Sequence, residues 1–105
     1  MKYRISTSSR ARKELLDIAK YILTEFDSPN SARRIANKIK RNIAELDTMP
    51  KRFALVSDEH LAQKGFRSVP VENYIIFYIV NENAKTVNII SIMHNKRDWI
   101  NLLLH

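Results

Sequence analysis

Five consecutive polar residues, His94 to Asp98, are the side chains of this sequence best suited to chemistry. A histidine titrates near neutral pH, so His94 could donate or accept a proton. Lys96 and Arg97 could stabilise negative charge that develops on a phosphate. We place Arg67 on an open sheet face, where a guanidinium would suit a phosphate or a carboxylate. The polar residues from His94 to Asp98 therefore predict a site at the end of the last strand, with Arg67 as a separate candidate on the sheet.

A structural role is the alternative interpretation of the same residues. His94 can end a strand with a satisfied hydrogen bond, and Asp98 can pair with a neighbouring cation at the surface. Trp99 can stack on a base, but the apolar residues that follow it favour an anchor for the end of the chain. The chemical and the structural interpretations both stay open from sequence alone.

The composition argues against several other kinds of site. There are no cysteines, so nothing indicates a redox site or a thiol nucleophile, and the single glycine, Gly65, cannot make a glycine-rich phosphate loop. The three histidines, His60, His94 and His105, lack the spacing of metal ligands. We therefore expect neither a metal nor a cofactor.

The longest apolar run, Tyr74 to Val80, indicates a strand that is covered on both faces. A chain of 105 residues forms one domain, 1–105, around a single core. We expect the chain to cover only one face of this strand. The uncovered face predicts a binding partner, because an exposed apolar patch usually marks an interaction surface.

Two helices are predicted before this strand. Ser8 is the expected N-cap of the first, and apolar residues then recur at helical spacing. Ser28 caps the second helix and Pro29 occupies its first position, where a missing N–H costs nothing; Pro50 marks the exit. The link between the helices is so short that they must form an antiparallel hairpin.

Strands account for much of the remaining chain. We expect them at Lys2–Ser6, Phe66–Val71, Tyr74–Val80 and Val87–Met93. Pro70 places one of them at a sheet edge, because proline cannot donate a ladder hydrogen bond. The connector 53–64 is irregular or a short helical turn, and the tail 99–104 is apolar enough to dock on the sheet. The fold class is α+β, in the order β-α-α-β-β-β, with a helical hairpin on one face of a small, mostly antiparallel sheet.

The formal net charge of +7 lies entirely in residues 1–52, whereas residues 53–105 are neutral. The second helix displays Arg33, Arg34, Lys38 and Arg41. This basic face either keeps the protein in solution or belongs to a small nucleic-acid-binding module. No signal peptide or membrane-spanning segment is predicted, so we expect a cytoplasmic protein without membrane contact.

Five motifs occur along the chain. They are Ala11-x-x-Glu14-Leu15, Pro50 after the second helix, Gly65-Phe66-Arg67, Asn73-Tyr74-Ile75-Ile76-Phe77-Tyr78 and His94-Asn95-Lys96-Arg97-Asp98-Trp99. In this combination the chain resembles the RelE/ParE toxin superfamily of bacterial type II toxin–antitoxin systems. The resemblance covers essentially the whole chain. It implies a helical hairpin on a small antiparallel sheet, and an antitoxin that wraps the toxin and covers its apolar strand.

The resemblance implies two possible mechanisms. RelE-like toxins cleave messenger RNA in the ribosome, but this chain has Ile75 where those nucleases tend to carry an arginine, and Trp99 lacks a hydroxyl that could donate a proton. ParE-like toxins poison DNA gyrase, and their Gly-aromatic-Arg pattern before an apolar strand, with a histidine at the end of the last strand, fits this chain better. We therefore favour a ParE-like toxin that contacts gyrase, with the ribosome-dependent RNase as the alternative.

The site assignments follow from this choice. The expected target-binding residues are His94, Asn95, Lys96, Arg97 and Trp99. The expected antitoxin-binding residues are Tyr74, Ile76, Tyr78, Leu16 and Leu23. In the RNase alternative, phosphate-binding Arg67, Lys96 and Arg97 and the proton-transferring His94 would be catalytic. We expect a hetero-oligomer with a cognate antitoxin, and gyrase as the target, with the ribosome and messenger RNA in its place under the alternative.

Overall fold

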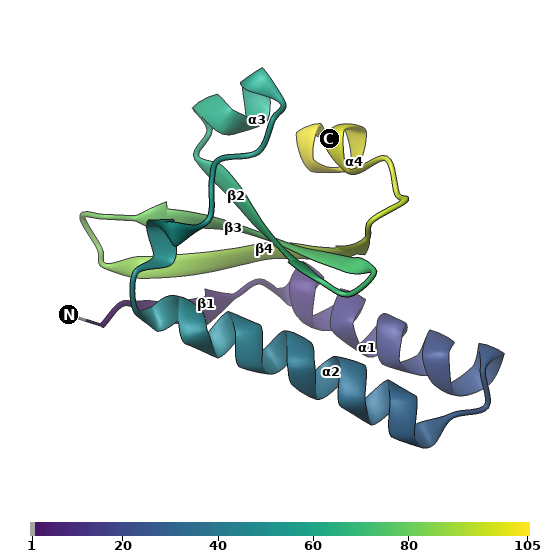
Figure 1. Ribbon diagram of the computed structural model, residues 1–105. Helices are drawn as coiled ribbons and strands as arrows, with labels where there is room; N and C mark the ends of the chain where they lie inside the picture. Colours follow the sequence, from purple (N-terminus) through teal and green to yellow (C-terminus); the bar gives the residue numbers. More distant parts are fainter. Residues whose placement is uncertain (1) are drawn as a thin grey trace.

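The computed structural model describes residues 2–105 and confirms the predicted α+β fold (Figure 1). Its strands are β1 (Arg4–Thr7), β2 (Phe66–Val71), β3 (Tyr74–Asn81) and β4 (Thr86–His94). Its helices are α1 (Ser9–Glu25), α2 (Pro29–Ala44), α3 (Glu59–Gln63) and α4 (Trp99–Leu104), with short 3-10 turns η1 (Glu45–Asp47) and η2 (Pro50–Arg52). The predicted order β-α-α-β-β-β is present, and two short helices, α3 and α4, are added to it.

The two long helices begin where their capping residues predict. The Ser8 hydroxyl accepts a hydrogen bond from Ala11 N–H at 3.0 Å, and the Ser28 hydroxyl accepts one from Ser31 N–H at 3.2 Å. Between the helices, Asp27 has a φ of 45°, which turns the chain sharply enough for α2 to run back along α1. The closed end of this hairpin projects beyond the sheet (Figure 1).

The sheet has the strand order β1-β4-β3-β2. β1 is parallel to β4, and the other two pairs are antiparallel, so the sheet is mostly antiparallel as expected. Pro70 lies in β2, which is an edge strand. A β-bulge at Ile90 interrupts the β3–β4 ladder, since Phe77 pairs with Ser91 while Tyr78 pairs with Ile89.

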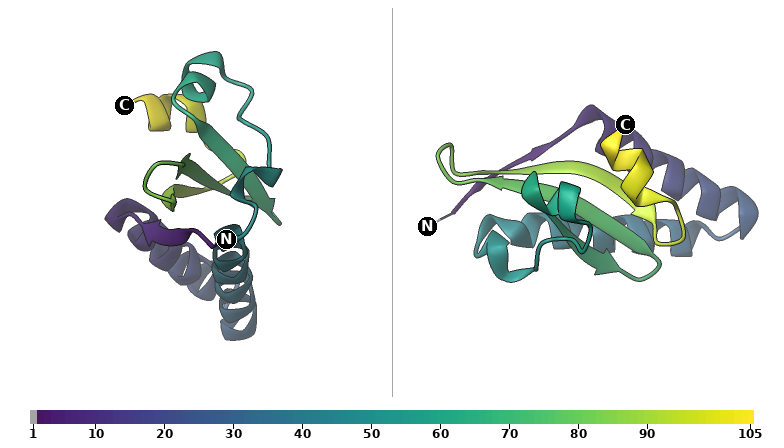
Figure 2. Two further views of the ribbon diagram at one scale, coloured as in Figure 1. Left: turned by 90° about the vertical axis from the view of Figure 1, so that its left-hand side faces the viewer. Right: turned by 90° about the horizontal axis from the view of Figure 1, so that it is seen from above.

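Side chains of β3 alternate between the two faces of the sheet. Ile76 and Tyr78 are buried against the α1–α2 hairpin, together with Ile39 of α2. Phe77 points to the opposite face, where it packs in a second cluster with Leu61 of α3. Figure 2 shows the long helices on one side of the sheet and α3 and α4 on the other.

The expectation of an uncovered sheet face is therefore wrong. The connector and the tail cover that face, since each folds into a helix too short to be detected from periodicity. After α3, Gly65 adopts a φ of 89° and its N–H donates to Ala62 O at 2.9 Å, which turns the chain into β2. Val56 N–H donates to Phe66 O at 3.0 Å, so the connector also pairs with the edge of β2.

Candidate functional site

β4 ends at His94, and the predicted polar segment forms a tight turn there. Asn95 N–H donates to Asn73 O at 2.8 Å, and Arg97 N–H donates to His94 O at 3.0 Å. Lys96 N–H donates to Nδ1 of His94 at 3.1 Å. Because Nδ1 accepts this bond, the neutral imidazole carries its proton on Nε2. The turn thus fixes the imidazole ring and leaves Nε2–H as its donor.

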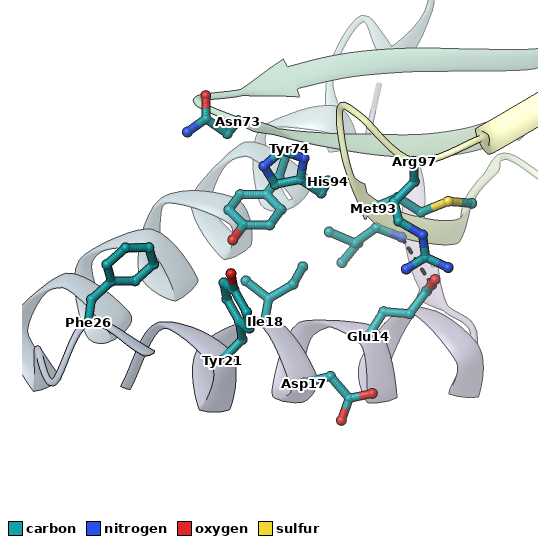
Figure 3. Close-up of a pocket in the computed structure, with 11 residues that line it drawn as sticks. Glu14, Asp17, Ile18, Tyr21, Phe26, Asn73, Tyr74, Met93, His94 and Arg97 are labelled. Carbon is teal, nitrogen blue, oxygen red and sulfur yellow. Dashed lines mark hydrogen bonds between the residues drawn. The ribbon is translucent and has the colours of Figure 1, made fainter. Parts of the chain in front are cut away.

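The His94 ring lies in a groove between the projecting end of the hairpin and the end of the sheet (Figure 3). The groove has a volume of about 630 Å³. The ring meets Tyr74 edge to face, with centroids 5.4 Å apart. Tyr21 of α1 and Phe26, which follows the last residue of that helix, form the aromatic wall and stay 54% and 66% exposed, so a partner can reach it. Arg97 extends over the same groove.

Glu14 of α1, like Tyr21, is a residue of this region to which sequence reasoning assigned no role. β1 ends before β4 does, and the Glu14 carboxylate occupies the free edge of β4 beyond it. Ile92 N–H donates to Oε1 of Glu14 at 3.1 Å, and the Ser91 hydroxyl donates to it at 2.9 Å. Arg10 Nε lies 3.6 Å from the other carboxylate oxygen. The motif residue Glu14 therefore joins α1 to the strand that carries His94.

The five predicted target-binding residues do not share one surface. His94 and Arg97 line the groove on the hairpin side, and Asn95 and Lys96 are exposed in the turn. Trp99 lies across the sheet, where its ring packs 5.3 Å from that of Phe77 and is partly buried. The structural interpretation of Trp99 as an anchor is confirmed.

Arg67 lies elsewhere, and the expectation of an open-face arginine is wrong. It pairs with Tyr78 in the β2–β3 ladder, so its side chain lies on the hairpin side of the sheet. Its Nη1 donates to Phe53 O at 2.7 Å, and the Tyr78 hydroxyl donates to Pro50 O at 2.6 Å. Tyr78 lies near the middle of β3, whereas Tyr74 pairs with His94 at the end of the strand. Arg67 therefore holds the connector and is separate from the groove.

The predicted antitoxin-binding residues divide by burial. Tyr74, Ile76 and Tyr78 are 8%, 0% and 0% exposed, because the chain's own hairpin covers them. Leu16 and Leu23 of α1 are 62% and 43% exposed. Only the two leucines are available to a partner in this conformation.

Burial, and next the neighbouring Tyr21, raise the pKa of Tyr74, so its hydroxyl stays protonated in the groove. The side chains of Lys96 and Arg97 form no ion pair within residues 2–105. Arg97 lines the groove together with the carboxylates of Glu14 and Asp17, while Lys96 leaves a positive charge at the turn. No cluster of three metal-ligating side chains occurs among the described residues.

The sequence model of one protein family matches residues 5–99; the family is described as the ParE toxin of the type II toxin–antitoxin system, parDE. The chain belongs to this toxin family. It is the toxin component of a type II toxin–antitoxin system, within the RelE/ParE superfamily. No curated protein matches the chain. No helix of the described residues is long and apolar enough to cross a membrane.

Solved structures with similar folds come from both branches of the superfamily. A chain from the chromosomal ParDE system of P. aeruginosa has a TM-score of 0.70 and 18% identity, over 89% of this toxin and 96% of that chain. A chain of the RelBE2 toxin–antitoxin complex of Mycobacterium tuberculosis has a TM-score of 0.67 and 22% identity, over 90% and 99%. A mutant of the E. coli toxin RelE in the free state has a TM-score of 0.67 and 15% identity, over 97% and 93%. At these identities the likeness concerns the fold alone.

Proposed function

We propose that this toxin inhibits DNA gyrase by direct protein contact, as a ParE-like toxin. The observation that carries the proposal is the separation of Arg67 from the other residues that an RNase would need, which lie at the end of β4 and in the turn after it. A nuclease must hold phosphate-binding and proton-transfer groups around one scissile bond. Arg67 binds the backbone of the connector beside the middle of β3, while His94 and Arg97 lie at the Tyr74 end of that strand. Trp99 is packed on Phe77 and has no hydroxyl.

The proposed target-binding surface is the turn after β4 together with the groove beside it. Asn95 and Lys96 are exposed in the turn, and His94 and Arg97 present donors at the groove. Trp99 contributes by anchoring α4 rather than by touching the target. The groove combines aromatic rings and Arg97 with the carboxylates of Glu14 and Asp17. Aromatic and arginine side chains carry much of the binding energy at protein interfaces.

The proposed partner in the cell is a cognate antitoxin, in a cytoplasmic hetero-oligomer. The complexes of the structural neighbours support this partner. On this toxin we assign it the exposed side of α1, at Leu16 and Leu23. The basic module on α2 is not favoured, because Arg34 and Lys38 are both paired with Glu72.

Purified toxin tests the proposal directly. We expect it to inhibit DNA supercoiling by gyrase, while a cell-free translation reaction with intact messenger RNA continues. Added antitoxin from the neighbouring gene should restore supercoiling. Messenger RNA cut within ribosomes, with unaffected supercoiling, would instead establish the RNase alternative.

A further inference from the structure

β1 presents a free edge to solvent. It is the outermost strand on its side of the sheet, and within residues 2–105 its strand partner is β4. Just before β1, Tyr3 N–H donates to Asp47 O of η1 at 2.7 Å, so the open part of the edge begins at Arg4. Arg4 N–H donates to Lys85 O at 2.9 Å and Ser8 N–H donates to Ile89 O at 3.0 Å. In a parallel ladder alternate residues face the neighbouring strand. The N–H and C=O groups of Ile5 and Thr7 therefore point away from the sheet.

A groove of about 430 Å³ runs along this free edge, between β1 and the α1–α2 hairpin. Its apolar floor includes Ile5 and Leu15. Three exposed cations, one from each of three elements, line it: Arg4 of β1, Arg12 of α1 and Lys40 of α2. None of the described residues that line the groove is acidic.

These three cations are unpaired within residues 2–105, where none forms an ion pair or a side-chain hydrogen bond. On the other side of α2, by contrast, two cations share the carboxylate of Glu72. A charged edge strand can serve only to prevent aggregation. That role needs charge on β1 alone, and it does not explain why α1 and α2 add cations at the same groove. The charge complementarity favours an acidic occupant.

We propose that an extended acidic segment of the antitoxin adds to β1 as a fifth strand. Its backbone pairs with the outward N–H and C=O groups of Ile5 and Thr7, and its carboxylates meet Arg4, Arg12 and Lys40. The segment's apolar side chains pack on the floor of the groove. A protein strand is favoured over nucleic acid because main-chain donors and acceptors alternate along the edge. The inference rests on the proposed function only for the identity of the partner.

Nuclear magnetic resonance on the full chain tests the site. The probe is a synthetic ten-residue peptide of alternating Val and Glu with blocked ends. We expect it to slow hydrogen exchange at the Ile5 and Thr7 amides by about tenfold or more at saturation. A peptide of alternating Val and Lys should not do so. Equal protection by both peptides, or protection by the acidic peptide only outside β1, would overturn the proposal.

Two triple variants separate this groove from a general effect of charge. R4E/R12E/K40E should weaken binding of the Val–Glu peptide by about tenfold or more at low salt. The matched variant K20E/R33E/R41E makes the same change in net charge on exposed residues that do not line the groove. Its affinity for the Val–Glu peptide should fall by less than about threefold. Equal losses in both variants would overturn the proposal, as would displacement of the peptide by an equimolar oligothymidylate.

A backbone-modified peptide tests strand pairing without changing the toxin. N-methylation of alternate residues on the pairing side of the peptide removes donors while keeping its charge. We expect this change to abolish protection of the two amides; retained protection would refute strand addition. The gyrase assay tests the proposed function separately. If the toxin binds the peptide at β1 but does not inhibit supercoiling, gyrase is refuted as the target while strand addition at β1 still holds.

Discussion

The two faces of the sheet are covered in different ways. On one face, two helices of 17 and 16 residues bury a continuous core that includes Ile39 and Tyr78. On the other, helices of five and six residues cover Phe77, and α4 has no buried residue of its own. We infer that the hairpin face supplies most of the stability of this toxin. The opposite face depends on a short terminal helix.

The segment between His94 and Trp99 crosses from one face to the other. His94 belongs to the hairpin face through Tyr74, and Trp99 belongs to the opposite face through Phe77. The proposed target-binding turn is therefore attached at both ends to different layers of the fold. Substitutions in each layer and in the turn can separate stability from binding.

The largest expected effect is on the hairpin face. Ile39→Ala removes a side chain that is 0% exposed, so the free energy of unfolding should fall by about 3 kcal/mol. Leu103→Ala in α4, where the side chain is only partly buried, should cost about 1 kcal/mol. Urea unfolding followed by circular dichroism measures both. Equal losses would contradict the difference between the faces.

The next effect concerns the edge where α1 meets β4. Glu14→Ala removes the acceptor of Ile92 N–H and of the Ser91 hydroxyl, so stability should fall by about 1–2 kcal/mol. Glu14→Gln keeps one oxygen acceptor, so its free energy of unfolding should fall by less than that of Glu14→Ala. Hydrogen exchange of the Ile92 amide should accelerate in the Ala variant. The exposed Glu25 is the control, since Glu25→Ala should leave that amide unchanged.

A smaller effect on stability, with a large effect on activity, is expected in the turn. Lys96 and Arg97 are exposed, so their double replacement by Ala should change the free energy of unfolding by less than about 0.5 kcal/mol. Inhibition of gyrase supercoiling should fall by about tenfold or more if these cations meet the target. Replacing Arg33 and Arg41 of α2 by Ala provides the matched control. Full inhibition by the first variant and loss in the second would move the target surface to α2.

The smallest expected effect is a pH dependence of stability that arises at Glu82, at the end of the sheet opposite to the His94 groove. Hydrogen bonds from Lys85, then Tyr3 and Lys51, lower the pKa of Glu82 from 4.5 to about 2. Because the folded-state pKa is depressed, the stabilisation is present above about pH 4.5 and is lost as the pH falls towards 2. The stability difference between the wild type and Glu82→Gln should shrink over that window, and melting temperatures measure it. A constant difference would show that Glu82 acts without its charge.

Local sequence signals determined where the two long helices begin, which strand lies at the sheet edge and where the last strand ends. Ser8 and Ser28 predicted the two helix starts through their hydroxyl acceptors, and Pro70 predicted the edge strand through its missing donor. The polar segment after Met93 was placed correctly at the end of the last strand. Each of these inferences depends on the chemistry of one residue and its near neighbours, which the sequence displays directly.

Only the tertiary structure decided on which face of the sheet each side chain lies and what covers that face. The side of the sheet on which Arg67 lies depends on its register with Tyr78, and a shift by one residue would reverse it. The bond between Glu14 and Ile92 joins residues 78 positions apart. The five and six residues of α3 and α4 are too few to show a repeating helical pattern in the sequence. Helices this short are stabilised by their packing over Phe77 rather than by intrinsic helix propensity. Contacts between distant segments set these features. The sequence indicated one part of them, since the apolar tail 99–104 was expected to dock on the sheet and does so.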